Sequence, residues 1–583
     1  KLRMRKTKIV CTLGPSTDTA EVLRNMLLSG MNVARFNFSH GSHEEHKKRL
    51  DTLKALREEM DLPVATLLDT KGPEIRLRTF EGGAAVLTEG QEFTLTTNDR
   101  QGGVDGCSVT YRDLPGDVVP GGTILLDDGL IRLTVLRVDG PDVVCRVENG
   151  GRIKDRKGVN LPGQHLSMPY VSAQDREDIL FGIQEGFDFI AASFVRSARD
   201  VLDLRSILEE HNSSIRIIAK IENQEGVSNL SEILSVSDGI MVARGDMGVE
   251  IDFTEIPILQ KQIIEQCVAC GKPVITATQM LESMIENPRP TRAEITDVAN
   301  AIYDGTSAIM LSGETAAGRY PAEAVATMDA IARRTEADIN YGKRMRAAAA
   351  EKHLSIAAAT AHAACTTALD IGADAILTVS HSGTTARLVS QFHPGTPIIA
   401  CVVEETVRRQ LALSWGIMPL QMPYARNTDE LISMATEVAQ KAGLIKAGDV
   451  VVLTAGLPVG VPGTTNMIKV HLVGDSLLTG VGVGTRTVTG PLCVCRTPDE
   501  VRQKFHPGDV LVVPFTTNDM LDAMRQSAAI IAEEAGANSH AATVGLTLDK
   551  PVITGAAYAT RVLPDGIKVA VDCARGTVRR LAQ

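Results

Sequence analysis

The stretch Ile217–Gly226, IIAKIENQEG, decides how the rest of the chain is interpreted. Its apolar run ends in Lys220, and Glu222 follows two positions later. Alternate residues of a strand point to the same side, so these two side chains would share one side. A structural ion pair is one interpretation. A second apolar run, Gly239–Ala243, also ends in charged residues, Arg244-Gly245-Asp246, and this favours a functional site where strand ends meet.

Apolar runs of this kind alternate with amphipathic helical stretches through the first part of the chain. The runs are Thr7–Leu13, Asn32–Phe38, Val64–Leu68, Phe187–Val195, Arg216–Ile221, Gly239–Ala243, Pro273–Ala277 and Ala308–Leu311. Capping boxes at Ser42 and Thr291 and a proline at Pro321 predict three of the helix starts. Eight alternating units predict an α/β protein with a (β/α)₈ TIM barrel, built from residues 1–70 and 170–340, whose chemistry lies at the carboxyl ends of the strands.

Residues 71–169 interrupt this alternation. The helical period is lost between Lys71 and about Pro169, and short β-rich runs such as Gln91–Thr96 are separated by turns such as Asp127-Asp128-Gly129. A turn roughly every ten residues predicts a small all-β domain, and we expect a small β-barrel inserted after the third barrel strand. Because the insertion lies at the chemical end of the barrel, we expect it to act as a lid.

The pattern changes again after residue 340. Residues 341–473 predict an open α/β domain, with apolar runs at Ala375–Ser380, Pro397–Val403 and Asp449–Ala455. Residues 474–489, which contain the glycine-rich stretch Gly480–Gly490 except its last residue, predict a linker or domain entrance. Residues 490–583 predict a fourth compact α/β unit.

Composition excludes several classes of protein. A net charge of −11 and 3% aromatic residues argue against nonspecific nucleic-acid binding. The sequence contains neither an apolar run long enough for a transmembrane helix nor the apolar core of a signal peptide, and its ten cysteines are scattered. We therefore expect a cytoplasmic protein without membrane or nucleic-acid partners.

Polar side chains follow six of the eight predicted strands, and together they suit phosphoryl chemistry. Glu222 and Asp246 are the right kind and number of carboxylates for Mg²⁺ that keeps water and substrate ligands. Arg35, Arg76 and Lys220 suit a transferring phosphoryl group. The oxygen-rich set that could hold a monovalent cation is Asn37, Ser39, Asp69 and Thr70. Backbone N–H groups where the chain turns from strand into helix at Gly245 could hold a carboxylate.

A metal site at His40-x-x-His43-x-x-His46 is an alternative use of this region. The helical spacing and the flanking glutamates and lysines favour a solvated helix face, with only His40 in a strand-end position. Caps and surface ion pairs remain the alternative for each polar residue taken singly.

Five long motifs together resemble the pyruvate kinase family. They are MNVARFNFSHG, LLDTKGPEIRLR, IIAKIENQEG, MVARGDMGVE and the stretch from TATQMLESMIENPRPTRAEITDVANAIYDGTSAIMLSGET to AAGRYP. The resemblance runs from about Lys6 to about Val473. It implies transfer of a phosphoryl group from phosphoenolpyruvate to ADP, giving pyruvate and ATP in glycolysis, with Mg²⁺ (or Mn²⁺) and K⁺ as cofactors, allosteric control and a homotetramer.

The resemblance also implies a role for each matching residue. Lys220 stabilises the transferring phosphoryl group, Arg35 contacts phosphate, and Thr278 lies near the proton path to the enolate carbon. Glu222 and Asp246 bind the divalent metal, and the backbone at Gly245 and Asp246 holds the substrate carboxylate together with Thr278. The nucleotide side is His40, Arg76 and Asn37, and the K⁺ ligands are Asn37, Ser39, Asp69 and Thr70. Glu74 in TKGPE goes with K⁺ dependence, because members with lysine there need no K⁺.

Two further stretches extend the resemblance. SHSGTTARL places hydroxyls and a glycine before a helix, and Ser380, Ser382, Thr384 and Thr385 could cradle the phosphate of a sugar-phosphate or nucleoside monophosphate effector, with GLPVGVPGTTN as the neighbouring loop. Ordinary loop and capping chemistry is the alternative.

The stretch EEAGANSHAATVGLTLDKPVITG resembles the phosphohistidine swivelling domain of phosphoenolpyruvate-using enzymes, with His540 at the carrier position. Asn538 replaces the usual Thr, and Gly545-Leu546 replaces Ala-Arg, so we expect a structural or regulatory domain with a vestigial histidine.

Two other functions are less compatible with these motifs. A phosphohistidine carrier would explain only about the last 95 residues. A noncatalytic sensor of phosphoenolpyruvate would be expected to lack Lys220 or a metal carboxylate, and both are present.

Overall fold

The computed structural model describes residues 5–349, 354–446, 448–457, 464–474 and 476–581. Two compact units result: Lys1–Leu369 with Thr378–Thr428 and Thr454–Met467, and Asp370–Leu377 with Asp429–Leu453 and Ile468–Gln583. The boundaries of the four predicted domains remain a prediction. Among the described residues, no helix combines the length and apolar character needed to span a bilayer.

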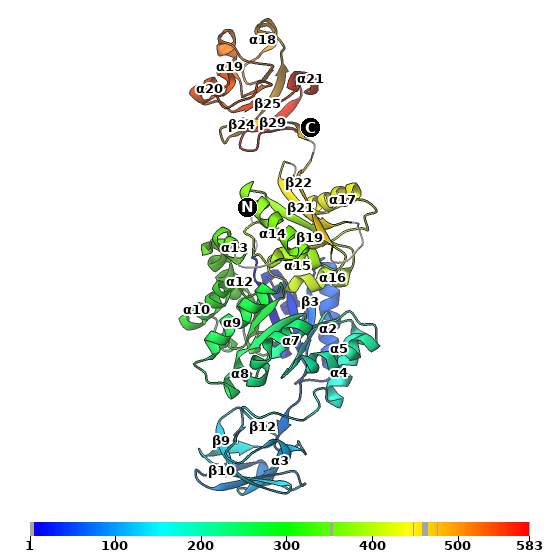
Figure 1. The fold of residues 1–583 in the computed structure, drawn as a ribbon, viewed down its shortest axis with the longest axis vertical. Coiled ribbons are helices and arrows are strands. Elements are labelled where there is room, and N and C mark those ends of the chain that lie inside the picture. Colours follow the sequence, from blue (N-terminus) through cyan, green and yellow to red (C-terminus); the bar gives the residue numbers. More distant parts are fainter. Residues whose placement is uncertain (1–4, 350–353, 447, 458–463, 475, 582–583) are drawn as a thin grey trace. The chain divides into compact units, whose positions relative to one another are not determined.

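A closed barrel of parallel strands forms the centre of the first unit, as predicted (Figure 1). Its strands are β1 (Lys8–Leu13), β2 (Val33–Asn37), β3 (Ala65–Asp69), β13 (Phe189–Ala192), β14 (Arg216–Ile221), β15 (Gly239–Ala243), β16 (Val274–Ala277) and β17 (Ala308–Leu311). The order around the barrel is β1-β17-β16-β15-β14-β13-β3-β2. Each strand lies within one of the eight predicted runs or extends it by one residue.

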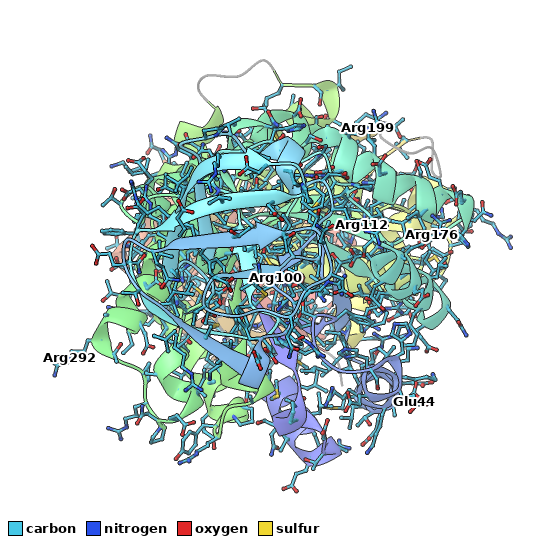
Figure 2. The ribbon with its side chains drawn as sticks, turned by 90° about the horizontal axis from the view of Figure 1, so that it is seen from below. Glu44, Arg100, Arg112, Arg176, Arg199 and Arg292 are labelled. Carbon is cyan, nitrogen blue, oxygen red and sulfur yellow. The ribbon has the colours of Figure 1, made fainter. Side chains whose placement is uncertain are left out.

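Helices cover the barrel and bury the strands from outside. The longer ones are α1 (Ala20–Ser29), α2 (His43–Glu59), α4 (Ala173–Glu185), α5 (Ala198–Glu210), α7 (Leu230–Val236), α9 (Ile256–Ala269), α10 (Arg292–Asp304) and α12 (Pro321–Asp338). The capping boxes at Ser42 and Thr291 are both formed. Figure 2 marks the outer helices α4, α5 and α10 by Arg176, Arg199 and Arg292.

The insertion is an all-β domain with its own apolar core. Its main sheet has the order β4-β12-β8-β9-β10-β6-β7. The strands are β4 (Ile75–Arg76), β6 (Glu92–Thr96), β7 (Gly106–Ser108), β8 (Thr123–Leu126), β9 (Ile131–Asp139), β10 (Asp142–Val147) and β12 (Gly158–Asn160), and β5 (Ala84–Leu87) pairs with β11 (Gly151–Lys154). A bridge between Leu77 and Val109 joins the two edges of the main sheet, which supports the predicted small barrel.

The α/β region after the barrel contains a five-stranded sheet of order β20-β19-β18-β21-β22. Its strands are β18 (Ala375–Val379), β19 (Ile398–Val402), β20 (Ile417–Gln421), β21 (Val450–Gly456) and β22 (Thr465–Leu472). The helices are α13 (Tyr341–Ala349), α14 (Ile356–Asp370), α15 (Thr384–Ser390), α16 (Glu405–Gln410) and α17 (Thr428–Lys441). Most of the predicted loop GLPVGVPGTTN lies outside the described residues.

The C-terminal region folds around an eight-stranded sheet of order β23-β30-β29-β25-β26-β27-β28-β24. Its strands are β23 (Ser476–Thr479), β24 (Val481–Val483), β25 (Thr487–Val494), β26 (Val510–Val513), β27 (Ala529–Ala532), β28 (Val552–Thr554), β29 (Lys568–Asp572) and β30 (Thr577–Arg580). The helices are α18 (Pro498–Lys504), α19 (Leu521–Gln526), α20 (His540–Thr547) and α21 (Ala559–Val562).

The predicted linker 474–489 is wrong as a description of this structure. It supplies β23, β24 and the start of β25 to the C-terminal sheet.

Candidate active site

Asp69, at the carboxyl end of β3, is the centre of a buried polar cluster. Its carboxylate accepts hydrogen bonds from Arg35 Nε at 2.6 Å, Lys220 Nζ at 3.0 Å and Ser193 Oγ at 3.1 Å. Burial alone would raise the pKa of Asp69, but the Arg35 and Lys220 cations outweigh it and lower that pKa. The carboxylate is therefore ionised and holds the two cations in place.

Lys220 points into the barrel mouth on the same side of β14 as Glu222, as the alternation predicted. Its ammonium lies 2.8 Å from Ser193 Oγ and 3.0 Å from Glu222 Oε1. Burial acts to lower the pKa of Lys220, but the Asp69 and Glu222 carboxylates raise it above its ordinary value. The sequence favoured separate roles over an ion pair here, and the structure contains the ion pair.

Glu222 is a candidate metal ligand whose carboxyl pKa is strongly raised. Oε2 accepts a hydrogen bond from Phe194 N at 2.5 Å. Burial raises the pKa of Glu222 to about 7 against the pull of Lys220, and the Asp246 carboxylate adds to the rise. Among the described residues, Oε1 accepts no hydrogen bond, although Lys220 Nζ lies 3.0 Å away. The Glu222 and Asp246 carboxylates repel each other, and one Glu222 oxygen accepts no hydrogen bond among the described residues. Such a pair fits a divalent cation that keeps several water ligands.

Helix α8 (Arg244–Glu250) begins at the end of β15 and presents Gly245 and Asp246. The Arg244 guanidinium is held by Asp297 at 2.7 and 2.8 Å and by the Thr278 carbonyl at 2.6 Å. The Gly245 N–H donates to Thr278 Oγ1 at 2.8 Å. Thr278 has a φ of +68°, which is unusual for a β-branched residue, and strained residues of this kind cluster at functional sites. The structure thus brings Gly245 and Thr278 together, and their role in holding a substrate carboxylate stays a prediction.

The proposed monovalent-cation ligands lie on two neighbouring strand ends. Asn37 and Asp69 are register partners on β2 and β3. Asn37 Oδ1 accepts a hydrogen bond from Ser39 N at 3.2 Å, and Thr70 Oγ1 donates to the Ala191 carbonyl at 3.3 Å. Carboxylate, amide and hydroxyl oxygens are donors of a kind that suits K⁺.

Arg35 is fixed between two strand ends. Its Nη1 donates to Thr12 Oγ1 at 2.9 Å while Nε binds Asp69. Held from both sides, the guanidinium is prepared to meet an anion without reorganising.

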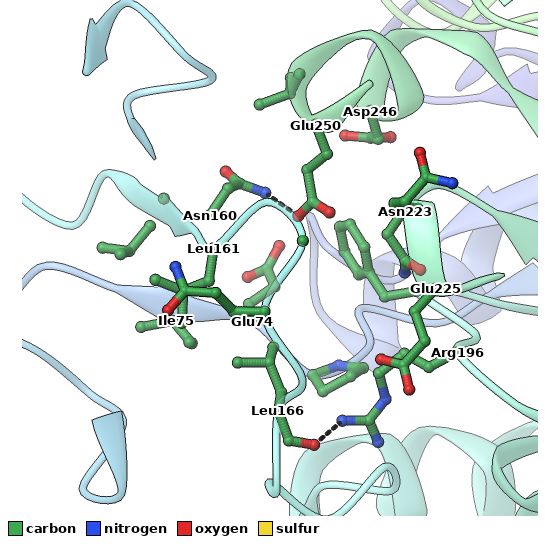
Figure 3. Close-up of a pocket in the computed structure, with 18 of the residues that line it drawn as sticks. Glu74, Ile75, Asn160, Leu161, Leu166, Arg196, Asn223, Glu225, Asp246 and Glu250 are labelled. Carbon is green, nitrogen blue, oxygen red and sulfur yellow. Dashed lines mark hydrogen bonds between the residues drawn. The ribbon is translucent and has the colours of Figure 1, made fainter. Parts of the chain in front are cut away.

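A cleft with a volume of about 620 Å³ lies between the β domain and the barrel. Figure 3 shows Glu74, Asn160, Asp246 and Glu250 around it. Arg76 also lines the cleft and is held by Glu74 at 2.7 Å. Lys220, Arg35, His40 and Asn37 are not among its lining residues, so this cleft contains Arg76 but not the other nucleotide candidates, His40 and Asn37.

The histidine triplet is not a metal site among the described residues. His43 Nε2 contacts Asp178 at 2.6 Å, and His46 Nε2 contacts the His40 carbonyl at 2.9 Å. The expected solvated helix face is wrong for His46, which is buried and stacks on Phe38.

Ser193 was missed by the sequence interpretation although it follows β13. Its hydroxyl contacts both Asp69 and Lys220. The available signal was a polar residue directly after the apolar run FIAA, at the same position as the other strand-end residues.

Of the predicted effector residues, Ser382 and Thr384 contact each other, whereas Thr385 contacts a residue of β22. Ser382 Oγ contacts Thr384 Oγ1 at 2.8 Å, and Arg387 donates to the Ser382 carbonyl at 2.7 Å. Thr385 is buried and contacts Thr465 of β22 at 2.7 Å. Ser380 contributes a backbone N–H to the Cys401 carbonyl at 3.4 Å.

His540 begins α20, and both of its ring nitrogens have partners. Nδ1 lies 2.7 Å from Thr516 Oγ1, and Nε2 lies 3.1 Å from Asn518 Oδ1.

A barrel mouth that combines a buried lysine, a fixed arginine and a pair of carboxylates suits the chemistry of a phosphotransferase. Comparisons with known proteins agree with this class. The pyruvate kinase barrel-domain model matches residues 4–325, the pyruvate kinase alpha/beta-domain model matches residues 358–471, and the model of the mobile domain of PEP-utilising enzymes matches residues 505–576.

Named relatives narrow the class further. Pyruvate kinase of Geobacillus stearothermophilus is 50% identical, and that of Bacillus licheniformis 48% identical, each over 99% of both chains. The crystal structure of a pyruvate kinase from Cryptosporidium parvum has a TM-score of 0.77 and 41% identity, and covers 81% of this chain and 96% of that chain. The chain belongs to the pyruvate kinase family.

Proposed function

We propose that the barrel mouth transfers the phosphoryl group of phosphoenolpyruvate to ADP through Lys220, Arg35 and Thr278. The observation that carries this proposal is the Lys220 ammonium, which is buried and held in place by Asp69, Ser193 and Glu222. Such a preorganised charge stabilises the anionic phosphoryl transition state without reorganisation.

The phosphoryl group moves from the enol oxygen to a terminal phosphate oxygen of ADP. Lys220 and Arg35 supply positive charge beside the group in transfer, while Arg76, His40 and Asn37 orient the nucleotide. Mg²⁺ or Mn²⁺, held by Glu222 and Asp246, would supply Lewis-acid polarisation of the substrate oxygens, and K⁺, held by Asn37, Ser39, Asp69 and Thr70, would add charge compensation.

The enolate that leaves phosphorus is protonated on carbon to give pyruvate. The N–H group at Asp246 orients its carboxylate, and the Gly245 N–H joins it when it leaves Thr278 Oγ1, to which it donates at 2.8 Å. The Thr278 hydroxyl lies against Gly245, close to the path of the proton. The β domain, 71–169, excludes water as a lid, which limits hydrolysis of the phosphoryl donor.

The direct test follows phosphorus by ³¹P NMR in a mixture of phosphoenolpyruvate, ADP, Mg²⁺ and K⁺. The proposal expects the phosphoenolpyruvate signal to be replaced by the γ-phosphate of ATP with one pyruvate formed per ATP. Release of inorganic phosphate instead would identify a hydrolase, and an unchanged spectrum would contradict the proposal.

We also propose regulation and assembly on the strength of the family. Ser380, Ser382 and Thr384 lie just before or at the start of α15, and their hydroxyls suit the phosphate of a sugar phosphate or nucleoside monophosphate. Thr385 can join them only if it leaves Thr465. A homotetramer in the cytoplasm completes the proposal. Sedimentation with and without each effector class tests both points.

A further inference from the structure

Ser193 lies at the junction of the catalytic cluster and the β domain. The side chain is 2% exposed, and its hydroxyl lies 2.8 Å from Lys220 Nζ, 3.1 Å from Asp69 Oδ1 and 2.6 Å from the Thr70 carbonyl. The ammonium donates to the hydroxyl oxygen, so the single hydroxyl proton is directed to an acceptor on β3 or just after it. Ser193 thus ties Lys220 to the strand that leads into the β domain.

The outgoing connection to the β domain packs directly on Ser193. Ser193 N donates to Thr70 Oγ1 at 3.1 Å. Gly72 has a φ of +77°, and a Cβ placed there would lie 2.9 Å from the Ser193 Cβ. A side chain at residue 72 would therefore displace Ser193. Glycine at this position allows the backbone of the outgoing connection to lie directly against Ser193.

The returning connection reaches the same residue from the other side. The Tyr170 hydroxyl donates to the Ser193 carbonyl at 2.8 Å, and Tyr170 is buried. Arg196 lies beside the Tyr170 ring, with its guanidinium carbon 6.0 Å from the ring centre. Both chain segments that join the β domain to the barrel therefore meet at Ser193.

Arg196 holds the returning segment against the barrel. Its guanidinium donates to the Leu166 carbonyl at 3.0 Å (Figure 3). It also pairs with Asp200 at 3.0 and 3.1 Å and donates to the Met168 carbonyl at 3.2 Å. A planar guanidinium fixed by a carboxylate directs its remaining donors in defined directions. Movement of residues 166–170 is thus coupled to Tyr170 and from there to Ser193.

We propose that Ser193 is a positioning residue that couples the position of the β domain to the Lys220 ammonium. When the two connections move, the Ser193 backbone moves with Thr70 and Tyr170, and its hydroxyl moves relative to Lys220. The Lys220 ammonium takes its productive position only when both connections between the barrel and the β domain are in their productive positions. This inference rests on the proposed function, because it concerns the rate of phosphoryl transfer by Lys220.

A double-mutant cycle with Ser193→Ala and Tyr170→Phe tests the inference. A displacement of about 1 Å in a catalytic group can cost roughly a hundredfold in rate. We expect Ser193→Ala to lower kcat by at least about tenfold, with KM for phosphoenolpyruvate within about threefold of the wild type. Tyr170→Phe lowers kcat by a smaller factor in the wild-type background.

The coupling distinguishes positioning from general support of the fold. Tyr170→Phe acts on kcat through the Ser193 hydroxyl, so it causes no further loss of kcat when Ser193 is already replaced by Ala. Its effect on the melting temperature is the same in the wild-type and the Ser193→Ala backgrounds. Turnover is expressed per Mn²⁺-binding site, which removes differences in the folded fraction. Multiplicative effects on kcat, or a kcat of Ser193→Ala within twofold of the wild type, would overturn the inference.

Matched controls change the same chemical groups elsewhere. Ser235→Ala removes an exposed hydroxyl that donates to the Glu232 carbonyl, and Tyr303→Phe removes an exposed hydroxyl that donates to Asp338. Both are expected to keep the wild-type kcat. If Ser193→Ala does not fold, Ser193→Cys replaces it in the cycle with the same expected pattern. Absence of turnover in the wild type would refute the proposed function and not this coupling.

Discussion

Replacing Lys220 by Met removes the central cation of the barrel mouth while keeping a side chain of similar length. Three contacts are lost, with Asp69, Ser193 and Glu222. Asp69 keeps Arg35 at 2.6 Å, but Glu222 keeps only the Phe194 N–H at 2.5 Å among the partners described for it. The substitution therefore leaves Glu222 as a buried carboxylate without a cation.

Two magnitudes follow from this geometry. Removing one partner of a buried ion pair costs about 3–5 kcal/mol of stability, and protonation of Glu222 keeps the cost near the lower value. The pKa of Glu222 is already raised by burial to about 7, against Lys220, so loss of the ammonium moves it higher still. A single uncharged donor is worth about 100- to 1,000-fold in rate, so loss of a full charge at the phosphoryl group should lower kcat by at least about 1,000-fold.

The assay measures three properties of the same Lys220→Met sample. Pyruvate formation from phosphoenolpyruvate and ADP gives kcat, thermal unfolding gives stability, and Mn²⁺ titration gives metal affinity. At a pH high enough to ionise Glu222, metal binding should persist or strengthen, because the Lys220 ammonium, which lies 3.0 Å from Glu222 in the wild type, no longer repels the cation. A kcat within tenfold of the wild type, or loss of the metal site in a folded variant, would refute this account of Lys220.

Three other predictions concern separate features. Burial lowers the pKa of His393 from 6.5 to about 3, with Arg344 and Lys6 adding to it, so the unfolded chain binds more protons between these pH values. Stability from this residue is complete above about pH 6.5 and falls by roughly 1.4 kcal/mol per pH unit below it. His393→Asn should flatten that slope in unfolding followed by Trp415 fluorescence, and an unchanged slope would contradict the assignment. Glu74→Lys should raise turnover without K⁺ towards the level with K⁺, and an undiminished K⁺ requirement would count against the cation site. Incubation with ³²P-labelled phosphoenolpyruvate should leave no acid-labile phosphate on the chain, and label that disappears in a His540→Ala variant would show that this histidine is a carrier.

The barrel and its strand ends were predictable because their signal is local. Each barrel strand is a short apolar run bounded by polar residues, and the period-two alternation places Lys220 and Glu222 on one side whatever the rest of the fold does. The ion pair between them was one of the interpretations that the sequence left open, because their separation depends on how β14 curves and on the position of Asp69 across the barrel. Sequence alone gave the kinds of groups at the mouth but not their hydrogen-bond partners.

Ser193 illustrates the limit of reasoning from charge. It is a neutral residue, and its importance comes from contacts with Asp69, Thr70, Tyr170 and Lys220, which are distant in sequence. The strand-end hydroxyl residues Ser39 and Thr70 were recognised, but nothing in the sequence places Ser193 beside Asp69 and Lys220. The same long-range packing turns Thr385 inward to Thr465, away from its predicted role.

The segment 474–489 was misinterpreted for a different reason. Its glycines have low strand propensity, which favours a linker. In the structure a Cβ at Gly482 would lie 1.6 Å from the Cys573 carbonyl oxygen. The glycine permits the close approach of the backbone that follows β29, and only the folded structure reveals that use.

The central claim is that this barrel mouth makes pyruvate and ATP with the help of two kinds of cation. A coupled assay of pyruvate formation from phosphoenolpyruvate and ADP, in the four combinations with and without Mg²⁺ and K⁺, tests it most directly. The account predicts full turnover only with both cations, and almost none without Mg²⁺. No pyruvate with both cations present would contradict the account and favour a protein that binds phosphoenolpyruvate without transferring its phosphoryl group.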